Sequence, residues 1–245
     1  MNEVLQSLHE RKSVRVFKDI KISESDKEAI LLAAIAAPTA GNQQLYTILD
    51  ITEQSLKDKL AVSCDNQPFI AKAPMVLIFC ADFQKWYDSF VEGGCSPRLP
   101  GVGDLMLAVE DSVIAAQNAV TAAQSLGIGS CYIGDIMELY EEHREMLELP
   151  EYVFPAAMLV FGYPTEQQRN RPKPERCDMK HIVHTNHYNR MTGDELRIMF
   201  QKKLGEQSYE DWATDFCYRK YNSSFSREMT RSVGEYLKSF GYKAK

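Results

Sequence analysis

The stretch LMLAVEDSVIAAQNAVTAAQSLGIGSCYIGD, residues 105–135, sets the pattern of the fold. Its first part, Leu105–Leu126, predicts a long helix that ends at Gly127, a residue suited to a left-handed helix end. The apolar run is long enough to cross a bilayer, but it contains acidic and amide side chains, so we expect a core helix. Residues 129–135 then predict a strand.

Further strands and helices are predicted on both sides of this helix. The expected strands are Tyr46–Ile51, Met75–Ala81 and Pro155–Pro164, and the expected helices begin near Ser23 or cover Glu53–Val62 and Glu138–Leu149. Residues 92–103 are rich in Gly and Pro and predict a mobile loop or lid. From Thr192 onward the chain reads as helical and aromatic-rich, so this tail must pack against the body or a second subunit.

The bulk composition narrows the class of protein. The 245 residues, 44% of them hydrophobic and 25% charged, are typical of a soluble globular protein. The net charge of -6 argues against nucleic-acid binding, and we expect no membrane span. The N-terminus has no secretory signal, so a cytoplasmic location is expected. The six cysteines form no Cys-x-x-Cys pair and are expected to be reduced and mostly buried.

The first segment with possible chemistry is Arg11-Lys12-Ser13-Val14-Arg15. Three cations and a hydroxyl group fall within five residues. Arginine offers a planar fork to oxyanions and lysine a point charge, so the segment suits a phosphomonoester. Taken alone, a cluster of this kind is more often a solvated basic turn.

Two other segments combine small and polar residues. Residues 37–44, Ala-Pro-Thr-Ala-Gly-Asn-Gln-Gln, would let a flat ring approach the backbone, or would form an ordinary helix-to-strand turn. Residues 127–134 carry three glycines, but Tyr132 stands where a dinucleotide fingerprint needs its last glycine, and the order is helix to strand. A Rossmann site is therefore excluded.

Two other patterns suggest sites that we do not expect. The series His181-x-x-His184-x-x-His187 has no obvious carboxylate or thiolate to complete a metal site, so no metal is expected. The adjacent acids Glu110-Asp111 and Glu141-Glu142 point in different directions on a helix, so we expect solvated faces or helix caps rather than a catalytic pair.

The chain resembles the nitroreductase family over most of residues 1–190. The resemblance lies in the order and spacing of four segments: the basic segment, the residue 37–44 turn, the Gly127–Gly134 segment and the late Arg171-Pro172-Lys173. The resemblance implies an α+β fold with a mixed, largely antiparallel sheet flanked by helices, in an intertwined homodimer. It implies an FMN-binding domain over residues 1–189 and a helical C-terminal extension over 190–245 that packs on the body or on the partner subunit. FMN is the implied cofactor, and NAD(P)H the implied co-substrate.

The resemblance also assigns roles to residues. Arg11 would contact the FMN phosphate with help from Ser13, Arg15 would reach the ring near N1 and O2, and Lys12 holds a position that is often basic in the family. The other implied contacts are Thr39, Gly41 and Asn42 along the ring, Gln67 at its pyrimidine edge, backbone groups of Tyr132, Ile133 and Gly134, and Arg171 with Lys173 at the phosphate. Alternatively, Lys173 and Arg176 form the late basic pair.

No acid, base or nucleophile is required from these residues, because the cofactor carries the chemistry. The resemblance implies a ping-pong mechanism, in which NAD(P)H gives a hydride to FMN and a small electron acceptor then takes the electrons. Nitroaromatics, quinones and flavins are the candidate acceptors. Alternatives are a dehalogenase-like or flavin-fragmenting enzyme, a non-catalytic FMN-binding or redox-sensing protein, and a helical interaction module built on residues 190–245.

Overall fold

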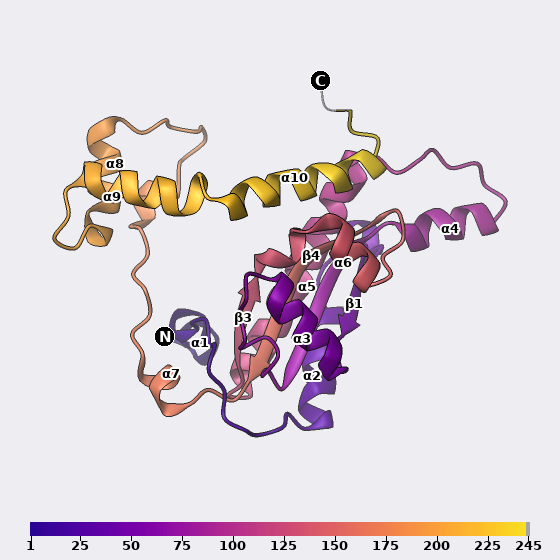
Figure 1. Cartoon of the computed structure of the whole chain (residues 1–245), viewed down its shortest axis with the longest axis horizontal. Helices are drawn as coiled ribbons and strands as arrows, with labels where there is room; N and C mark the ends of the chain where they lie inside the picture. The colour runs from indigo at the N-terminus through magenta and orange to yellow at the C-terminus, as the bar shows by residue number, and fades with distance from the viewer. Residues whose placement is uncertain (244–245) are drawn as a thin grey trace. The chain divides into compact units, whose positions relative to one another are not determined.

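The computed structural model describes residues 1–243, with a four-stranded sheet at its centre. The sheet has the order β1-β2-β4-β3, and each neighbouring pair is antiparallel (Figure 1). The strands are β1 (Tyr46–Asp50), β2 (Met75–Asp82), β3 (Gly129–Ile133) and β4 (Val153–Gly162). A single parallel bridge joins Ser13 to Ser130 of β3. The predicted α+β architecture and its four strands are confirmed.

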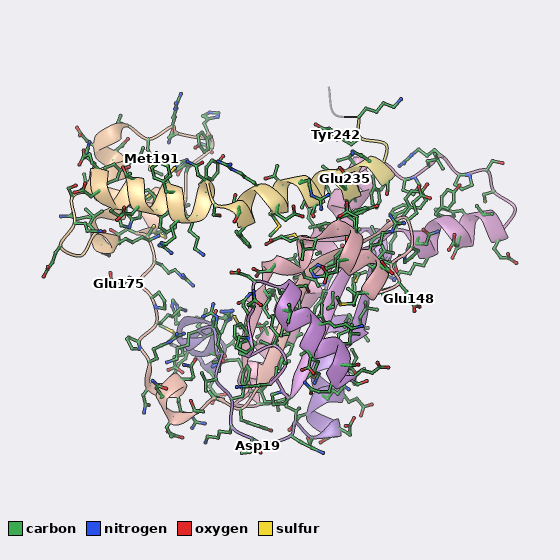
Figure 2. All side chains as sticks on the ribbon, in the orientation of Figure 1. Asp19, Glu148, Glu175, Met191, Glu235 and Tyr242 are labelled. Atoms are coloured by element: carbon green, nitrogen blue, oxygen red, sulfur yellow. The ribbon has the colours of Figure 1, made fainter. Side chains whose placement is uncertain are left out.

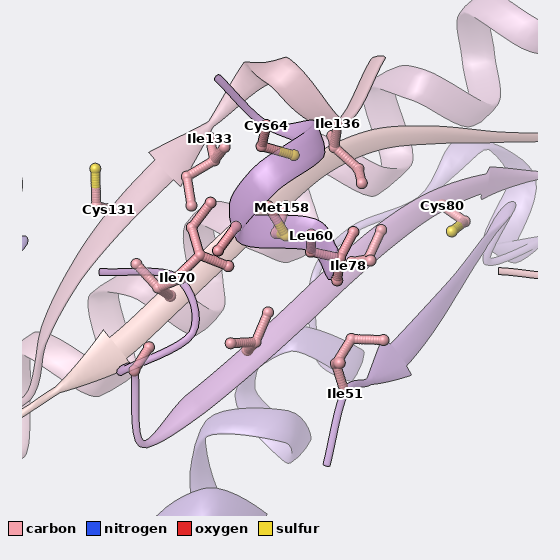
Figure 3. Packing of buried hydrophobic residues seen from close by; sticks show 14 of the residues in the cluster. Ile51, Leu60, Cys64, Ile70, Ile78, Cys80, Cys131, Ile133, Ile136 and Met158 are labelled. Carbon is pink, nitrogen blue, oxygen red and sulfur yellow. The ribbon is translucent and has the colours of Figure 1, made fainter. Parts of the chain in front are cut away.

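The two central strands explain the uninterrupted apolar runs in the sequence. Every residue of β2 and β4 is buried, because helices cover both faces of the sheet. Consecutive side chains of β2 alternate between two cores, with Ile78 in one and Leu77 and Phe79 in the other. Figure 3 shows the first core, where Ile78 and Met158 lie near Leu60.

Different helices form the two covering layers. α2 (Glu24–Ile35) and α5 (Val102–Ser125) pack on one face of the sheet, while α3 (Gln54–Ser63), η2 (Gly134–Met137) and α6 (Tyr140–Met146) pack on the other. The Ser23 side chain caps α2 as predicted, by accepting from the Asp26 N–H. The predicted helices are thus confirmed, with ends that shift by a few residues.

The long helix α5 begins three residues earlier than predicted. Asp104 accepts a hydrogen bond from the Gly101 N–H at 2.7 Å and pairs with both guanidinium nitrogens of Arg98, which fixes the start of the helix. Residues 95–100 before it are irregular, and the unpredicted α4 (Gln84–Glu92) precedes them. Within residues 1–243, no helix has both the length and the apolar character that a membrane span needs.

The chain divides into two compact units. The first holds Met1–Arg171 and residues 228–243, and the second is Pro172–Arg227, so the expected boundary at residue 190 falls inside the second unit. The predicted helical character after Thr192 is confirmed. The remaining elements are α1 (Glu3–Glu10), η1 (Ala40–Asn42), α7 (Glu166–Asn170), η3 (Met179–His181), α8 (Gly193–Phe200), η4 (Gln201–Lys203), α9 (Tyr209–Phe216), η5 (Cys217–Tyr221) and α10 (Ser224–Ser239).

The last part of α10 packs within the first unit. Tyr236 is 1% exposed and makes edge-on ring contacts with Tyr140 and Phe154, at centroid distances of 4.5 and 4.9 Å. Ser232 Oγ accepts a hydrogen bond from the Tyr140 N–H at 2.9 Å. Glu235, labelled on α10 in Figure 2, instead pairs with Lys238 on the same helix. The end of the tail therefore adds to this chain's own core.

The cysteines only partly follow the expectation of mostly buried thiols. Cys64, Cys80 and Cys131 are buried, Cys177 is partly exposed, and Cys95 and Cys217 are exposed. All six are free thiols, and burial raises the pKa of Cys80 to about 12. "Mostly buried" was wrong for half of them, because three lie in loops or in the second unit rather than in the sheet core.

Candidate functional site

The basic segment leaves α1 and runs along the edge of β3. Arg11 ends α1, and the Val14 N–H donates to the Ser130 carbonyl oxygen at 2.9 Å. This close approach needs a glycine opposite, because a Cβ at Gly129 would stand 2.6 Å from the side chain of Val14. The segment is therefore seated on the sheet and is not a free basic turn.

Two arginines of this region have unsatisfied polar atoms. The Nε atoms of Arg11 and Arg171 are buried and have no hydrogen-bond partner. Arg171 Nη2 donates to the Ser13 carbonyl oxygen at 2.8 Å, which brings the late arginine to the early segment. A buried N–H without a partner is costly, so these guanidinium groups are suited to an anionic ligand.

The Lys12 side chain binds backbone carbonyl groups of this chain. Its ammonium group donates to the carbonyl oxygens of Arg169, at 2.6 Å, and Arg171. It therefore fastens the end of α7 to the basic segment, and its donors are at least partly used. Among residues 1–243, neither Lys12 nor Arg11, Arg15 or Arg171 pairs with a carboxylate. The positive charge of the cluster is thus not neutralised by the chain itself.

Arg15 connects the cluster to the predicted Gln67 segment. Its guanidinium carbon lies 5.9 Å from the ring centre of Phe69, and its N–H donates to Gln168 Oε1 at 3.2 Å. The Gln67 side chain donates from Nε2 to the Cys64 carbonyl oxygen at 2.8 Å, which leaves its own oxygen without a bond in the described chain. Gln168, which is 8% exposed, was missed in the sequence because nothing marks it among the polar residues of the loop.

Strand β3 supplies the next side of the site. Ile133 is buried, Tyr132 is partly exposed, and Gly134 is exposed where the strand turns into η2. Burial raises the pKa of Tyr132 to about 12, and the positive charge of Arg11 acts in the opposite direction. The same charge influences the buried thiol of Cys131, whose pKa is raised by burial and lowered in part by Arg15. The structure thus brings residues 11–15, 67–69, 131–134 and 168–171 together.

The predicted turn with Thr39, Gly41 and Asn42 lies elsewhere in the chain. The turn is bonded to Asp111 in the middle of α5, whereas α1 packs near Gln124 at the end of that helix. Thirteen helical residues correspond to about 20 Å. One chain therefore carries two separate parts of the predicted site.

The prediction for Asp111 was wrong. We expected a solvated acid or helix cap, but its side chain is on the buried face of α5 and the residue is 2% exposed. The spacing Ala108, Asp111, Ala115 could have indicated this, because these positions lie on one stripe of a helix. Glu110, by contrast, is exposed as expected.

The remaining predicted residues lie in the second unit. Lys173 and Arg176 follow Arg171 across the boundary between the units, so the register of the late basic pair stays a prediction. His181 is buried and its Nδ1 has no hydrogen-bond partner, while His184 Nδ1 accepts from the Asn189 N–H at 3.1 Å. No cluster of three or more His, Cys, Asp or Glu side chains in residues 1–243 is arranged to hold a metal ion.

Comparison with known proteins gives consistent similarities. A family model described as "Nitroreductase family" matches residues 8–163, a range that includes the early basic segment but ends before Arg171. An FMN reductase (NAD(P)H) of Bacillus subtilis is 29% identical and covers 99% of this chain and 94% of its own. An oxygen-insensitive NADPH nitroreductase of Salmonella typhimurium is 31% identical, with 84% and 82% covered.

Solved structures are similar over nearly the whole chain. The NADPH:FMN oxidoreductase from Vibrio harveyi, solved with NAD+, has a TM-score of 0.83 at 25% identity, with 98% of each chain covered. NfrA2 of B. megaterium has a TM-score of 0.83 at 27% identity, with both chains fully covered. The similarity thus extends through both units of the fold.

Proposed function

Since this chain belongs to the nitroreductase family, we propose that it is an NAD(P)H-dependent oxidoreductase with FMN as its cofactor. The observation that carries the proposal is the pair of buried, unpartnered Nε atoms on Arg11 and Arg171. A phosphomonoester would give both guanidinium groups the acceptors that the chain does not supply. Ser13, whose carbonyl oxygen accepts a hydrogen bond from Arg171, would donate from its hydroxyl group to the same phosphate.

The other residues of the site have distinct tasks. Arg15 holds a positive charge near the pyrimidine edge of the ring, where it favours the uptake of electrons. Gln67 offers its free carbonyl oxygen to a ring N–H, and Tyr132, Ile133 and Gly134 offer backbone groups. Lys12 acts indirectly, because it holds the segment that carries Arg171.

Bound FMN supplies two-electron chemistry, in which a hydride is accepted from NAD(P)H and the electrons then pass to a second substrate. Nitroaromatics, quinones and flavins are the proposed acceptors, in a ping-pong sequence that uses one site twice. The protein has to bind and orient the substrates, and it needs no proton donor of its own at the ring. If the protein oxidises NAD(P)H but prefers none of these acceptors, the enzyme class stands and the proposed acceptors do not.

We further propose that the active form is a homodimer. The Thr39–Asn42 turn is bonded to Asp111, whereas α1, which ends at Arg11, packs near Gln124, so a second copy would bring its turn to the ring. The exposed side of α5 has the apolar surface that such a contact needs. Its exposed apolar residues are Met106, Leu107, Val113 and Ile114.

The dimer proposal predicts that Val113→Asp gives a monomer that no longer retains FMN. A buried, unpaired carboxylate at the interface would cost several kcal/mol, on the order of 3. Val62→Asp is the matched control, because Val62 is also exposed but lies on α3, over the opposite face of the sheet. Mass measurement in solution, together with the flavin content, tests the prediction. A monomeric wild-type protein that retains FMN would contradict it.

The phosphate assignment predicts that Arg11→Gln weakens FMN binding roughly tenfold to hundredfold, the range for loss of a charged hydrogen bond. Riboflavin has the same ring but no phosphate, so its affinity should stay within about threefold of wild type. Lys21→Gln, at an exposed lysine, is the control and should change neither affinity. Fluorescence titration with both ligands provides the test. Equal losses for FMN and riboflavin would refute the assignment.

The enzyme class itself is tested by the absorption spectrum of the purified protein and by anaerobic titration with NADH and NADPH. We expect flavin bands that bleach on addition of either nicotinamide and return on addition of a quinone. A protein that binds FMN but is not reduced would favour the non-catalytic, redox-sensing alternative. A protein that stays colourless after addition of FMN would overturn the proposal.

A further inference from the structure

Asp111 is a buried acid that the sequence reading had left outside the site. We propose that it is a positioning residue of the flavin site, whose carboxylate holds the turn from Ala40 to Leu45 in the shape that meets the ring. The inference rests on the proposed function, because the turn has a ring to meet only if FMN binds. It adds a residue that acts through the backbone and touches neither cofactor nor substrate.

The geometry is that of a two-point clamp. Asp111 Oδ1 accepts from the Ala40 N–H at 2.9 Å, and Oδ2 accepts from the Leu45 N–H at 3.1 Å. These two amides lie at the beginning and the end of the turn. An ionised carboxylate accepts at both oxygens and can satisfy both amides at once. Asparagine, with the same shape, could satisfy only one.

The Ala40 and Leu45 amides are the hydrogen-bond donors that residues 1–243 supply to this buried carboxylate. Within residues 1–243 no basic side chain forms an ion pair with it, although the residue is 2% exposed. A buried charge without a counter-ion is costly. Tyr46 lies close enough that its pKa is raised, first by burial and then by the charge of Asp111.

The turn itself needs to be held, which is a separate observation. Gly41, Asn42 and Gln44 have φ angles of 56°, 57° and 52°. Left-handed backbone is unfavourable for residues other than glycine and persists where its surroundings over-determine it, often at ligand sites.

Two further bonds hold the same turn. Thr39 Oγ1 accepts from the Gln44 N–H at 3.2 Å, and Trp86 Nε1 donates to the Gln43 carbonyl oxygen at 2.8 Å. Asp111 therefore belongs to a set of side chains that imposes one strained shape on the residues proposed to face the ring.

The test compares Asp111→Asn with wild type in two measurements on the full chain. Hydrogen exchange without cofactor should show faster exchange at the Ala40 or Leu45 amide. FMN titration should show a dissociation constant raised about tenfold or more, as expected when one buried N–H faces an amide donor. The visible circular dichroism of bound FMN should also change, because the ring meets a displaced turn.

Leu77→Ala is the control for general destabilisation. Leu77 is fully buried in β2, and it is hydrogen-bonded neither to the turn nor to the basic segment through its side chain, which is purely apolar. This variant should lower the thermal midpoint at least as much as Asp111→Asn, yet leave the FMN dissociation constant of the folded protein within about threefold of wild type. A loss of affinity that simply follows the thermal midpoint in both variants would make Asp111 structural only and would overturn the inference.

Trp86→Phe keeps the inference testable if Asp111→Asn does not fold. The change removes one bond to the turn and preserves most of the ring, and it should raise the FMN dissociation constant about fivefold to tenfold. If wild type binds FMN but the Asp111 and Trp86 variants show unchanged affinity and circular dichroism, the role of Asp111 is overturned and the proposed function is not affected. Wild type that fails to bind FMN would overturn the proposed function as well.

Discussion

Gly129→Ala is expected to lower the free energy of unfolding by about 1–3 kcal/mol and to weaken FMN binding about tenfold or more. The new Cβ would stand 2.6 Å from Val14 Cγ2 and 2.8 Å from Val14 Cβ, distances that side-chain atoms do not tolerate. Val14 is 5% exposed, so it has no solvent-side space to move into. The segment would have to leave β3, and Arg11, Ser13 and Arg15 would leave with it.

Gly103→Ala is the matched control for this prediction. Nothing lies within 4 Å of a Cβ at Gly103, which is in the first turn of α5. Alanine there should raise stability by up to about 1 kcal/mol and should not change FMN affinity. Urea unfolding and FMN titration measure both effects. If Gly129→Ala bound FMN as tightly as Gly103→Ala does, the segment would not depend on its contact with β3.

Glu138→Gln is expected to make the protein more stable above pH 7 by on the order of 2 kcal/mol. The pKa of Glu138 is raised to about 7, first by burial and then by the negative charges of Asp135, Asp65 and Glu228. The residue is 8% exposed, and its Oε1 has no hydrogen-bond partner. Ionisation therefore places a charge where nothing in the described chain stabilises it.

The direction of the pH dependence follows from proton binding. Between an ordinary pKa of about 4.3 in the unfolded chain and about 7 in the folded protein, only the folded state holds the proton. The stability associated with the neutral form is thus fully present below about pH 4 and is lost as the pH rises to 7.

Unfolding in urea at pH 5 and pH 8 tests this behaviour. The variant should exceed wild type at pH 8, and the difference should become small at pH 5. Glu142→Gln, an exposed position on α6, is the control and should show little change between the two pH values. A constant difference between Glu138→Gln and wild type from pH 5 to pH 8 would contradict the assigned ionisation.

The parts of the fold that sequence could predict are those with a strong local pattern. β2 and β4 were predicted because strands buried on both faces must be apolar without interruption. α5 was predicted because its length and its glycine end are local features. α4 was not predicted, although Trp86, Tyr87, Phe90 and Val91 recur at helical spacing, because it is only nine residues long and borders the Gly- and Pro-rich stretch.

The candidate site was predictable in its residue types but not in its connections. The sequence shows four cationic residues at positions 11, 12, 15 and 171, yet it cannot show that Lys12 is bonded to carbonyls 157 and 159 residues away. Such partners are set by the fold as a whole. Asp111 was wrongly predicted for a different reason: the adjacent acids were tested only as a catalytic pair, and the buried stripe on which Asp111 lies was not followed along the helix.

The bond between Arg171 and Ser13 spans 158 residues, and this has a consequence for the order of events during synthesis. A ribosome releases Arg11–Arg15 early, but the groups that seat the segment arrive only with β3 and then with α7. Contacts of such long sequence separation form late in folding. We therefore expect a nascent chain to acquire flavin affinity only after residue 171 has emerged, so that retention of the flavin would report the packing of β3 and α7 against the basic segment.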